Sequence, residues 1–125
     1  MILDTNAVSA LLIGDRAIEK LLVASERHEL PVIVVGEYRY GLMRSKFRKR
    51  LGVLLDDLIR ESIVLPICAA TADSYALVRE RLRRKGHPIP ENDVWISALA
   101  IEHGLDIVSR DAHFDAVEGV RRRSW

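Results

Sequence analysis

The sequence predicts a single α/β domain, residues 1–125, in which helices flank a mostly parallel central sheet of four to five short strands. Short apolar runs alternate with segments whose apolar residues recur at helical spacing, an arrangement typical of βαβ units. No linker and no shift in composition divides the chain, whose 125 residues are close to the usual size of one domain. We therefore expect one core built around one sheet.

The expected strands are short and bounded by turn or capping residues. They lie at Ile2–Leu3, Leu30–Val35, Ile63–Leu65 and Ile107–Val108, with a last edge strand beginning at Val120. The second of these is rich in β-branched residues, which favours a strand buried in a parallel sheet. Right-handed crossovers between such strands give a mostly parallel order.

Helices are expected between the strands. They lie over Ala7–Ile13, across Ile18–Leu22, from Gly36 to Met43, along the apolar stripe Phe47–Leu58, across Tyr75–Leu82, over Val94–Glu102 and briefly around Phe114. Gly86 and Gly104 follow two of these segments at the position where glycine commonly ends a helix. Between them, the two prolines of His87–Pro90 predict an extended loop.

Charge is balanced overall but unevenly distributed. The 19 Lys and Arg residues against 18 Asp and Glu residues give a net charge of only +1. One basic cluster carries no acid among its members and consists of Arg44, Lys46, Arg48, Lys49 and Arg50. A second, spanning residues 79–85, holds five basic residues and the single acid Glu80. Basic patches on a nearly neutral protein suit a polyanion that is bound and released, although charge runs are more often a solvated helix face.

Several classes of protein are not expected. No apolar stretch approaches the roughly 20 residues of a membrane span, and no signal peptide opens the chain, so a cytoplasmic protein is predicted. Cys68 is the only cysteine and follows an apolar run, which suggests a buried, inert thiol in a reducing compartment. Trp95, inside an apolar helix, is expected to be core. The four histidines show no close-spaced pair of the kind found on zinc-binding helices.

Four acids fall where the predicted strands and helices meet. Asp4 ends the first strand, Glu37 follows the second at the mouth of a helix, and Asp111 lies just past the fourth. Asp93 begins the helix that leads into the fourth strand. In open α/β sheets the functional crevice lies at the carboxyl ends of the strands, so all four are expected to converge there.

This convergence predicts a metal site. Any one of the acids is explained as a helix cap or turn residue, but four carboxylates at one edge repel one another unless a cation neutralises them. Oxygen ligands of this kind select Mg²⁺ or Mn²⁺. A metal held in this way activates a water for phosphodiester hydrolysis, so no nucleophilic side chain is needed. The sequence contains no G-x-S-x-G elbow, P-loop or G-x-G-x-x-G motif.

Further residues accompany the acids. Polar neighbours that could anchor the ligands, or simply cap helices, are Thr5, Asn6, Asn92 and Ser109. Candidate RNA-binding residues are Arg39, Arg44, Lys46, Arg48, Lys49 and Arg50. Tyr38 and Tyr40 lie beside Arg39, and aromatic rings next to arginines suit stacking on unpaired bases.

The order of these segments resembles the PIN-domain nucleases, and more narrowly the VapC toxins of bacterial and archaeal toxin–antitoxin pairs. The segments that carry the resemblance are Ile2–Asn6, Val35–Gly41, Asn92–Ala98 and Val108–Asp111 with Phe114. The resemblance implies a PIN fold, Mg²⁺ or Mn²⁺ dependence, and endonuclease action on structured RNA such as tRNA or rRNA. It also implies a cognate VapB antitoxin, with a homodimer or a hetero-oligomer as the assembly. The family's acidic residues map to Asp4, Glu37, Asp93 and Asp111, and its hydroxyl after the first Asp to Thr5; Ser109 stands where the family more often has Thr.

Two other functions remain open at the level of sequence. A non-catalytic RNA- or protein-binding module would keep the fold without needing the acids, whereas all four are present. A phosphatase of the haloacid dehalogenase type would need a second Asp at position 6, which is Asn6, and a supporting lysine motif that is not evident.

Overall fold

The sheet of the computed structural model, which describes residues 1–25 and 27–125, contains five parallel strands. The strands are β1 (Ile2–Leu3), β2 (Glu29–Pro31), β3 (Ile63–Leu65), β4 (Ile107–Val108) and β5 (Arg122–Arg123). Their order across the sheet is β3-β2-β1-β4-β5, so the prediction of a parallel sheet of four to five strands is confirmed. The chain moves outward from β1 in one direction and returns to its other side with β4, which makes the β1–β4 boundary the topological switch point.

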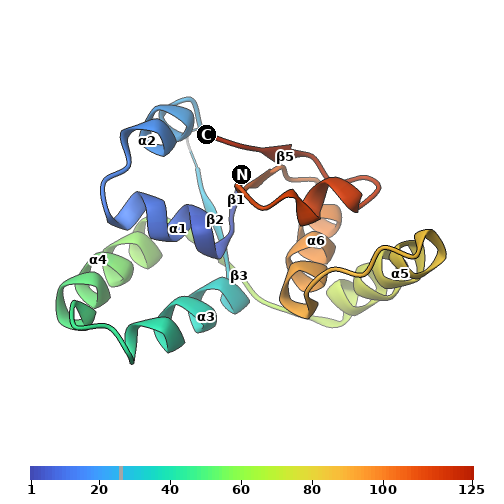
Figure 1. Cartoon of the computed structure of the whole chain (residues 1–125), viewed down its shortest axis with the longest axis horizontal. Helices are drawn as coiled ribbons and strands as arrows, with labels where there is room; N and C mark the ends of the chain where they lie inside the picture. The colour runs from blue at the N-terminus through green and yellow to red at the C-terminus, as the bar shows by residue number, and fades with distance from the viewer. Residues whose placement is uncertain (26) are drawn as a thin grey trace.

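Helices cover both faces of this sheet. They are α1 (Thr5–Leu12), α2 (Arg16–Val23), α3 (Val32–Leu42), α4 (Arg48–Glu61), α5 (Ala69–Lys85), α6 (Glu91–His103) and the short 3₁₀ helix η1 (Ala112–Ala116). Figure 1 shows α1, α3 and α4 on one side of the strands and α5 and α6 on the other. Among the described residues, no helix is long and apolar enough to cross a membrane.

The second strand is shorter than its composition suggests. Leu30–Val35 was predicted as a strand, but β2 ends at Pro31 and α3 begins at Val32. Pro31 occupies the N-cap position of α3, and its ring, which fixes φ near the observed −58°, is tolerated at the start of a helix. Val34 and Tyr38, four residues apart, bury one face of the new helix, so tertiary packing overrides the β preference of the Val and Ile residues. Glu37 therefore lies inside α3 and not at its mouth.

Most other boundaries agree with the predictions to within a few residues, although α5 begins at Ala69, six residues before Tyr75. α1 starts at Thr5, two residues before the predicted Ala7, because Asp4 caps it. β5 starts at Arg122 and not at Val120. Gly86 and Gly104 end α5 and α6 in the left-handed conformation, with φ of 62° and 65°, as expected for helix-terminal glycines.

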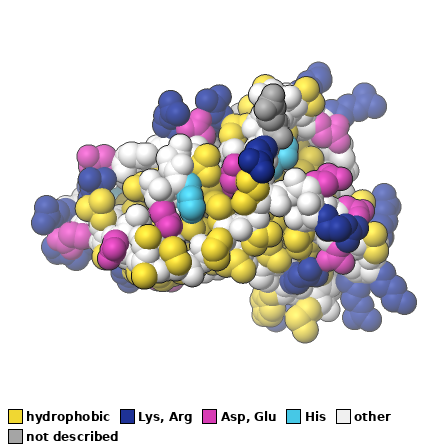
Figure 2. Space-filling view, turned by 180° about the vertical axis from the view of Figure 1, so that it is seen from behind, with side chains coloured by type: hydrophobic (Ala, Val, Ile, Leu, Met, Phe, Trp, Pro, Cys, Tyr) yellow, Lys and Arg dark blue, Asp and Glu magenta, His cyan; other side chains and the backbone are white. Residues whose placement is uncertain are grey.

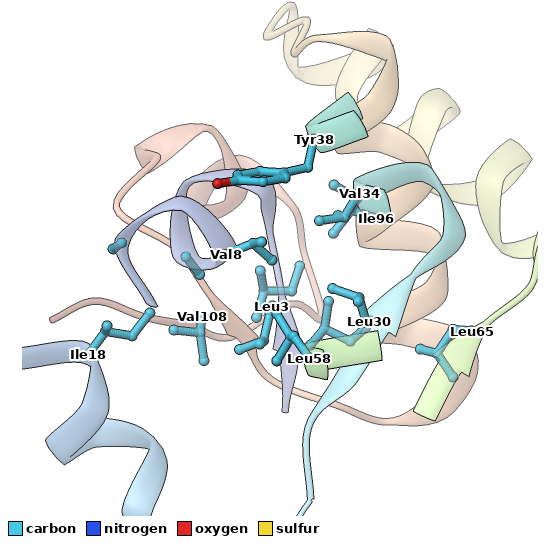
Figure 3. Packing of buried hydrophobic residues seen from close by; sticks show 14 of the residues in the cluster. Leu3, Val8, Ile18, Leu30, Val34, Tyr38, Leu58, Leu65, Ile96 and Val108 are labelled. Carbon is cyan, nitrogen blue, oxygen red and sulfur yellow. The ribbon is translucent and has the colours of Figure 1, made fainter. Parts of the chain in front are cut away.

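The larger of two buried clusters joins the strands to helices on both sides of the sheet. Leu3, Leu30 and Val108 from the strands meet Val8 of α1 and Ile96 of α6 in Figure 3, and all are buried. A smaller cluster joins α5 to α6 and the segment after η1 through Val78, Leu82, Val94 and Val117. These clusters fix β1, β4, α3 and α6 relative to one another, and the residues of the site are carried on these elements or directly beside them.

Three predictions of burial are wrong or only partly right. Cys68 is exposed, because it caps α5 just after the edge strand β3, where the chain runs along the surface. Trp95 is half-buried and stacks on Tyr75 with a centroid separation of 4.0 Å, so it lies at the margin of the core. Phe47, placed on the apolar stripe of α4, precedes that helix and is 56% exposed.

Candidate functional site

A polar pocket opens at the carboxyl ends of β1 and β4. Its volume is about 290 Å³, and its lining residues are Asp4, Thr5, Asn6, Ser9, Glu37, Asp93, Ile96 and Asp111. The four acids that the sequence singled out thus lie around one space. They reach it from the end of β1, the middle of α3, the first turn of α6 and the N-cap of η1.

Asp4 is the most enclosed of the four acids. Its side chain accepts hydrogen bonds from the backbone N–H of Ala7 at 2.9 Å, the Ser109 hydroxyl at 2.6 Å and the Asn6 amide at 2.8 Å. Burial raises the pKa of Asp4 to about 6, against the opposing hydrogen bonds from Ser109 and Ala7. The charges of Asp93 and Asp111 raise this pKa further.

Glu37 is held between two polar side chains. Thr5 donates its hydroxyl to Glu37 Oε2 at 2.5 Å, and Asn92 donates its amide to Oε1 at 2.7 Å. Both carboxylate oxygens therefore have a partner, although Glu37 lies one turn further along its helix than predicted. These bonds tie α3 to the starts of α1 and α6.

Asp93 and Asp111 face each other across His113. His113 Nδ1 lies 3.2 Å from Asp93 Oδ2 and 3.0 Å from Asp111 Oδ1. Burial raises the pKa of Asp93, while His113 lowers it and the charges of Asp111 and Glu37 raise it. One possible ligand atom from each of Asp93, Asp111 and His113 lies within 4.8 Å of the other two.

Sequence reasoning missed His113. A search for paired histidines at helical spacing does not find it, because its partners are carboxylates from α6 and from the loop after β4. The sequence did offer one signal for His113, because it lies only two residues after Asp111, within the short helix η1 that Asp111 caps. The backbone N–H of His113 also bonds Asp111 Oδ1 at 2.9 Å, which fixes this turn.

All four residues predicted to anchor the acids make hydrogen bonds within the site. Thr5 and Asn92 contact Glu37, and Ser109 contacts Asp4. Asn6 bridges β1 and the loop after β4, since its amide also donates to Ser109 Oγ at 3.2 Å and its carbonyl oxygen accepts the Arg110 N–H at 3.0 Å. These bonds hold the carboxylates in place before any ligand binds.

The donor set fits a hard divalent cation. Carboxylate oxygens dominate the pocket. Burial is the main cause of the raised pKa values of Asp4 and Asp93, and the charges of the neighbouring acids add to it; a bound cation would favour the ionised form of both groups. Asp93, Asp111 and His113 form the closest group of ligand atoms, while Asp4 and Glu37 line the same pocket outside that group. The pocket therefore suits an oxygen-rich metal with room for further ligands.

The first basic cluster lies apart from the acids, on the connection between α3 and α4. A crevice of about 690 Å³ is lined by residues 43–50, which include Arg44, Lys46, Arg48, Lys49 and Arg50. Arg44 lies over the Tyr40 ring at 5.3 Å and Lys46 over the Phe47 ring at 5.2 Å. Figure 2 shows Lys and Arg side chains gathered at this end of the molecule, at the lower right. Arg39, also predicted to bind RNA, pairs with Asp56 at 2.8 Å.

The second basic cluster, on α5, is partly neutralised within the chain, since three of its five basic residues pair with an acid. Glu80 pairs with Arg83 at 2.8 Å and with Arg84 at 3.0 Å, and Arg79 pairs with Glu91. The hydrogen bonds from Arg83 and Arg84 lower the pKa of Glu80 to about 2. Acidic and basic side chains accordingly alternate at the opposite end of Figure 2. Of the two clusters, the one between α3 and α4 has more uncompensated charge.

Comparison with known proteins places this arrangement in a family. The PIN domain model matches residues 1–120. The VapC ribonuclease Y4jK of Sinorhizobium fredii is 31% identical over 121 residues, which cover 89% of this chain and 86% of that protein. Ribonuclease VapC5 of Mycobacterium tuberculosis is 27% identical over 122 residues, or 94% of this chain and 87% of that protein.

A solved structure agrees over nearly the whole chain. The crystal structure of DNA-bound VapBC from Salmonella typhimurium matches with a TM-score of 0.88 and 25% identity, covering 99% of this chain and 96% of that one. The chain therefore belongs to the PIN domain family, and its relatives within that family are VapC ribonucleases.

Proposed function

We propose that residues 1–125 form one nuclease domain, an Mg²⁺- or Mn²⁺-dependent endoribonuclease that acts as the toxin of a VapBC-type pair. The observation that carries this proposal is the convergence of four carboxylates on one pocket, with the pKa of the buried Asp4 raised to about 6. A protein gains nothing in stability from holding four repelling acids together, so the arrangement suits a site that binds a cation. The relatives named VapC ribonucleases support the reaction class.

In the proposed site the metal would be held by Asp4, Glu37, Asp93 and Asp111. When bound, Mg²⁺ or Mn²⁺ supplies Lewis acidity that activates water and neutralises charge on the scissile phosphate. The polar residues around the pocket hold the carboxylates in position. Ser109 and Asn6 fix the Asp4 carboxylate, while Thr5 and Asn92 hold both oxygens of Glu37. His113, next to Asp93 and Asp111, orients those two carboxylates toward each other.

The α3–α4 connection is the proposed contact for the RNA backbone. Lys46, Arg48, Lys49 and Arg50 have no acidic partner among residues 1–25 and 27–125. Cations of this kind bind phosphates, and the exposed rings of Tyr40 and Phe47 suit stacking on unpaired bases. Structured RNA with exposed loops, such as tRNA or rRNA, presents both phosphates and unpaired bases.

The proposed partner is a VapB-type antitoxin. The similar structure from Salmonella typhimurium is a VapBC complex, and a toxin of this kind acting on cellular RNA in the cytoplasm needs a protein that restrains it. The proposed assembly is a homodimer or a hetero-oligomer with that antitoxin.

The test is RNA cleavage by purified protein. We expect wild type to cleave structured RNA with Mg²⁺ or Mn²⁺ and to lose activity with EDTA, and Asp93→Asn to lower the rate by about 100-fold or more. Asp73→Asn is the matched control, because Asp73 is an exposed acid on α5 away from the pocket. Equal activity in Asp93→Asn and Asp73→Asn would contradict the catalytic assignment. A well-folded wild type that binds RNA but cleaves none with either metal would support a non-catalytic binding module instead.

A further inference from the structure

One cation lies beside the acidic pocket but is turned away from it. Arg110 directly precedes Asp111 in the loop after β4, yet its guanidinium reaches the Asp15 carboxylate of the α2 N-cap at 3.0 Å. The same guanidinium lies over the ring of Trp125, 4.4 Å from its centroid. Trp125 Nε1 in turn donates to Asp15 Oδ2 at 3.3 Å, so Asp15, Arg110 and Trp125 form a closed triangle. Figure 1 shows the end of the chain marked C lying beside α2.

The main chain of Arg110 is fixed independently of this triangle. Its N–H donates to Asn6 Oδ1 at 3.0 Å, and the preceding carbonyl of Ser109 accepts from Arg122 at 3.2 Å. The N–H of Ser109 donates to the carbonyl of Arg123 at 3.0 Å. Only the long side chain of Arg110 is therefore free to choose a direction, and its contacts with Asp15 and Trp125 decide it.

The direction of the Arg110 side chain matters because the next residue, Asp111, lines the acidic pocket. Asp4 and Asp111 both line the pocket, and an arginine fork pairs well with carboxylates. A guanidinium that entered this pocket would neutralise the acids from within the chain and compete with a cation from solution. Stability does not explain the triangle well, since the Arg110 side chain is 53% exposed and exposed ion pairs contribute little.

We infer that Trp125 and Asp15 are positioning residues that hold the Arg110 guanidinium out of the acidic pocket, leaving the four carboxylates open to a divalent cation. This inference rests on the proposed function for its catalytic consequence, but its central claim concerns cation binding. Trp125 supplies the flat face and Asp15 the charge, and the two together select one orientation of Arg110.

The experiment is titration of the full chain with MnCl₂ by calorimetry, paired with kcat and KM on a labelled structured RNA. We expect Trp125→Ala to weaken Mn²⁺ binding about tenfold and to lower kcat with little change in KM, in the range found for residues that support metal ligands. Trp125→Phe keeps a flat ring and should restore most of both values. Asp15→Asn keeps an oxygen to cap α2 but loses the charge, and should weaken Mn²⁺ binding to a smaller extent.

The decisive variant removes the Arg110 guanidinium itself. If the released guanidinium is what competes with Mn²⁺, then Arg110→Ala added to Trp125→Ala restores the affinity to within about twofold of wild type, on the logic of a double-mutant cycle. Arg121→Gln is the matched control. Arg121 is an exposed arginine directly before β5 that pairs with Asp106, and its replacement should leave Mn²⁺ binding unchanged.

Each outcome decides the inference. Wild-type Mn²⁺ affinity in both Trp125→Ala and Asp15→Asn overturns it, as does a Trp125→Ala defect that Arg110→Ala fails to relieve. If Trp125→Ala does not fold, Asp15→Asn with and without Arg110→Ala makes the same comparison. A wild type that binds Mn²⁺ but cleaves no RNA would defeat the proposed function alone, whereas a wild type that binds no Mn²⁺ would defeat both.

Discussion

Ser109 donates a hydrogen bond of 2.6 Å to Asp4, a residue 105 positions away in the sequence. The two side chains meet because β1 and β4 are adjacent and parallel, with Leu3 in register with Val108. Both residues directly follow their strands, so the register alone brings them together. Ser109 Oγ also accepts the N–H of Asp111 at 2.8 Å, and one hydroxyl thus connects two of the four acids.

The first prediction concerns this hydroxyl. Ser109→Ala removes a hydrogen bond that lowers the pKa of Asp4, so that pKa should rise further above 6 and the carboxylate should bind Mn²⁺ less readily near neutral pH. We expect Mn²⁺ affinity and cleavage rate to fall by about 10- to 100-fold. Ser109→Thr keeps the hydroxyl and should retain most of the activity. Loss of activity in Ser109→Thr equal to that in Ser109→Ala would mean that packing, and not the hydroxyl, is what matters.

The second prediction is a pH dependence of stability. Asp4 binds its proton more tightly in the folded state, where its pKa is about 6, than in the unfolded chain, where it is near 3.8. Without metal, the fold should therefore be most stable below pH 4 with respect to this group and should lose up to about 3 kcal/mol as pH rises through 6. Thermal melts in EDTA between pH 4 and pH 7.5 measure this loss.

Bound Mn²⁺ and the substitution Asp4→Asn should each reduce the loss of folding stability that accompanies the rise in pH. Millimolar Mn²⁺ binds the ionised carboxylates, so its stabilising shift in Tm should be small at pH 5 and larger above pH 6. Asp4→Asn cannot ionise and should show a flatter pH profile in EDTA than wild type. A Tm shift with Mn²⁺ that is the same at pH 5 and pH 7.5 would argue against Asp4 as part of the metal site.

The third prediction separates the two basic clusters. Lys49→Gln with Arg50→Gln removes two charges that have no acidic partner among the described residues, and should reduce the slope of log K for RNA against log salt by about 1.4. Arg83→Gln with Arg84→Gln also removes two charges, but both are paired with Glu80. That control should change the slope much less. Equal slopes for the two double variants would mean that the α3–α4 connection has no special role in phosphate binding.

The positions of Asp4 and Asp111 could be predicted because they depend on a general rule. Parallel strands end at one edge of the sheet, so residues that directly follow neighbouring strands meet whatever the details of packing. Asp93 was predictable for a related reason, because a helix that returns to the sheet begins near that same edge. The sheet itself followed from the alternation of short apolar runs with helical patterns.

The start of α3 was not predictable from local composition. Val32–Val35 reads as a strand by residue type, but Pro31 and the burial of Val34 and Tyr38 make it the first turn of a helix. His113 was missed because its neighbours come from other segments, and the Arg110 contacts with Asp15 and Trp125 were missed for the same reason. Such contacts depend on the loop after β4 and on the path of the chain beyond β5, and no periodicity encodes either.

The last prediction joins the site to the partner. Wild-type protein expressed alone should arrest growth, because an active endoribonuclease attacks the RNA of its own cell. Asp4→Asn should abolish the arrest by removing a metal ligand. The fold should survive, since asparagine is as good a helix N-cap as aspartate and still offers an oxygen to the N–H of Ala7. Asp73→Asn, an exposed substitution of the same kind, should remain toxic.

The same strains test the antitoxin. A small protein encoded beside the gene should restore growth when expressed with wild type, and it should co-purify with both wild type and Asp4→Asn. An acidic pocket is best blocked by a cation, so an arginine of the partner that pairs with one carboxylate would displace the metal. Retained binding by Asp4→Asn would place most of the contact outside that carboxylate, whereas lost binding would identify Asp4 as the partner's main anchor. Full toxicity of a well-folded Asp4→Asn variant would refute the assignment of Asp4 to catalysis, because the growth arrest would then arise without the enclosed carboxylate on which the proposed site depends.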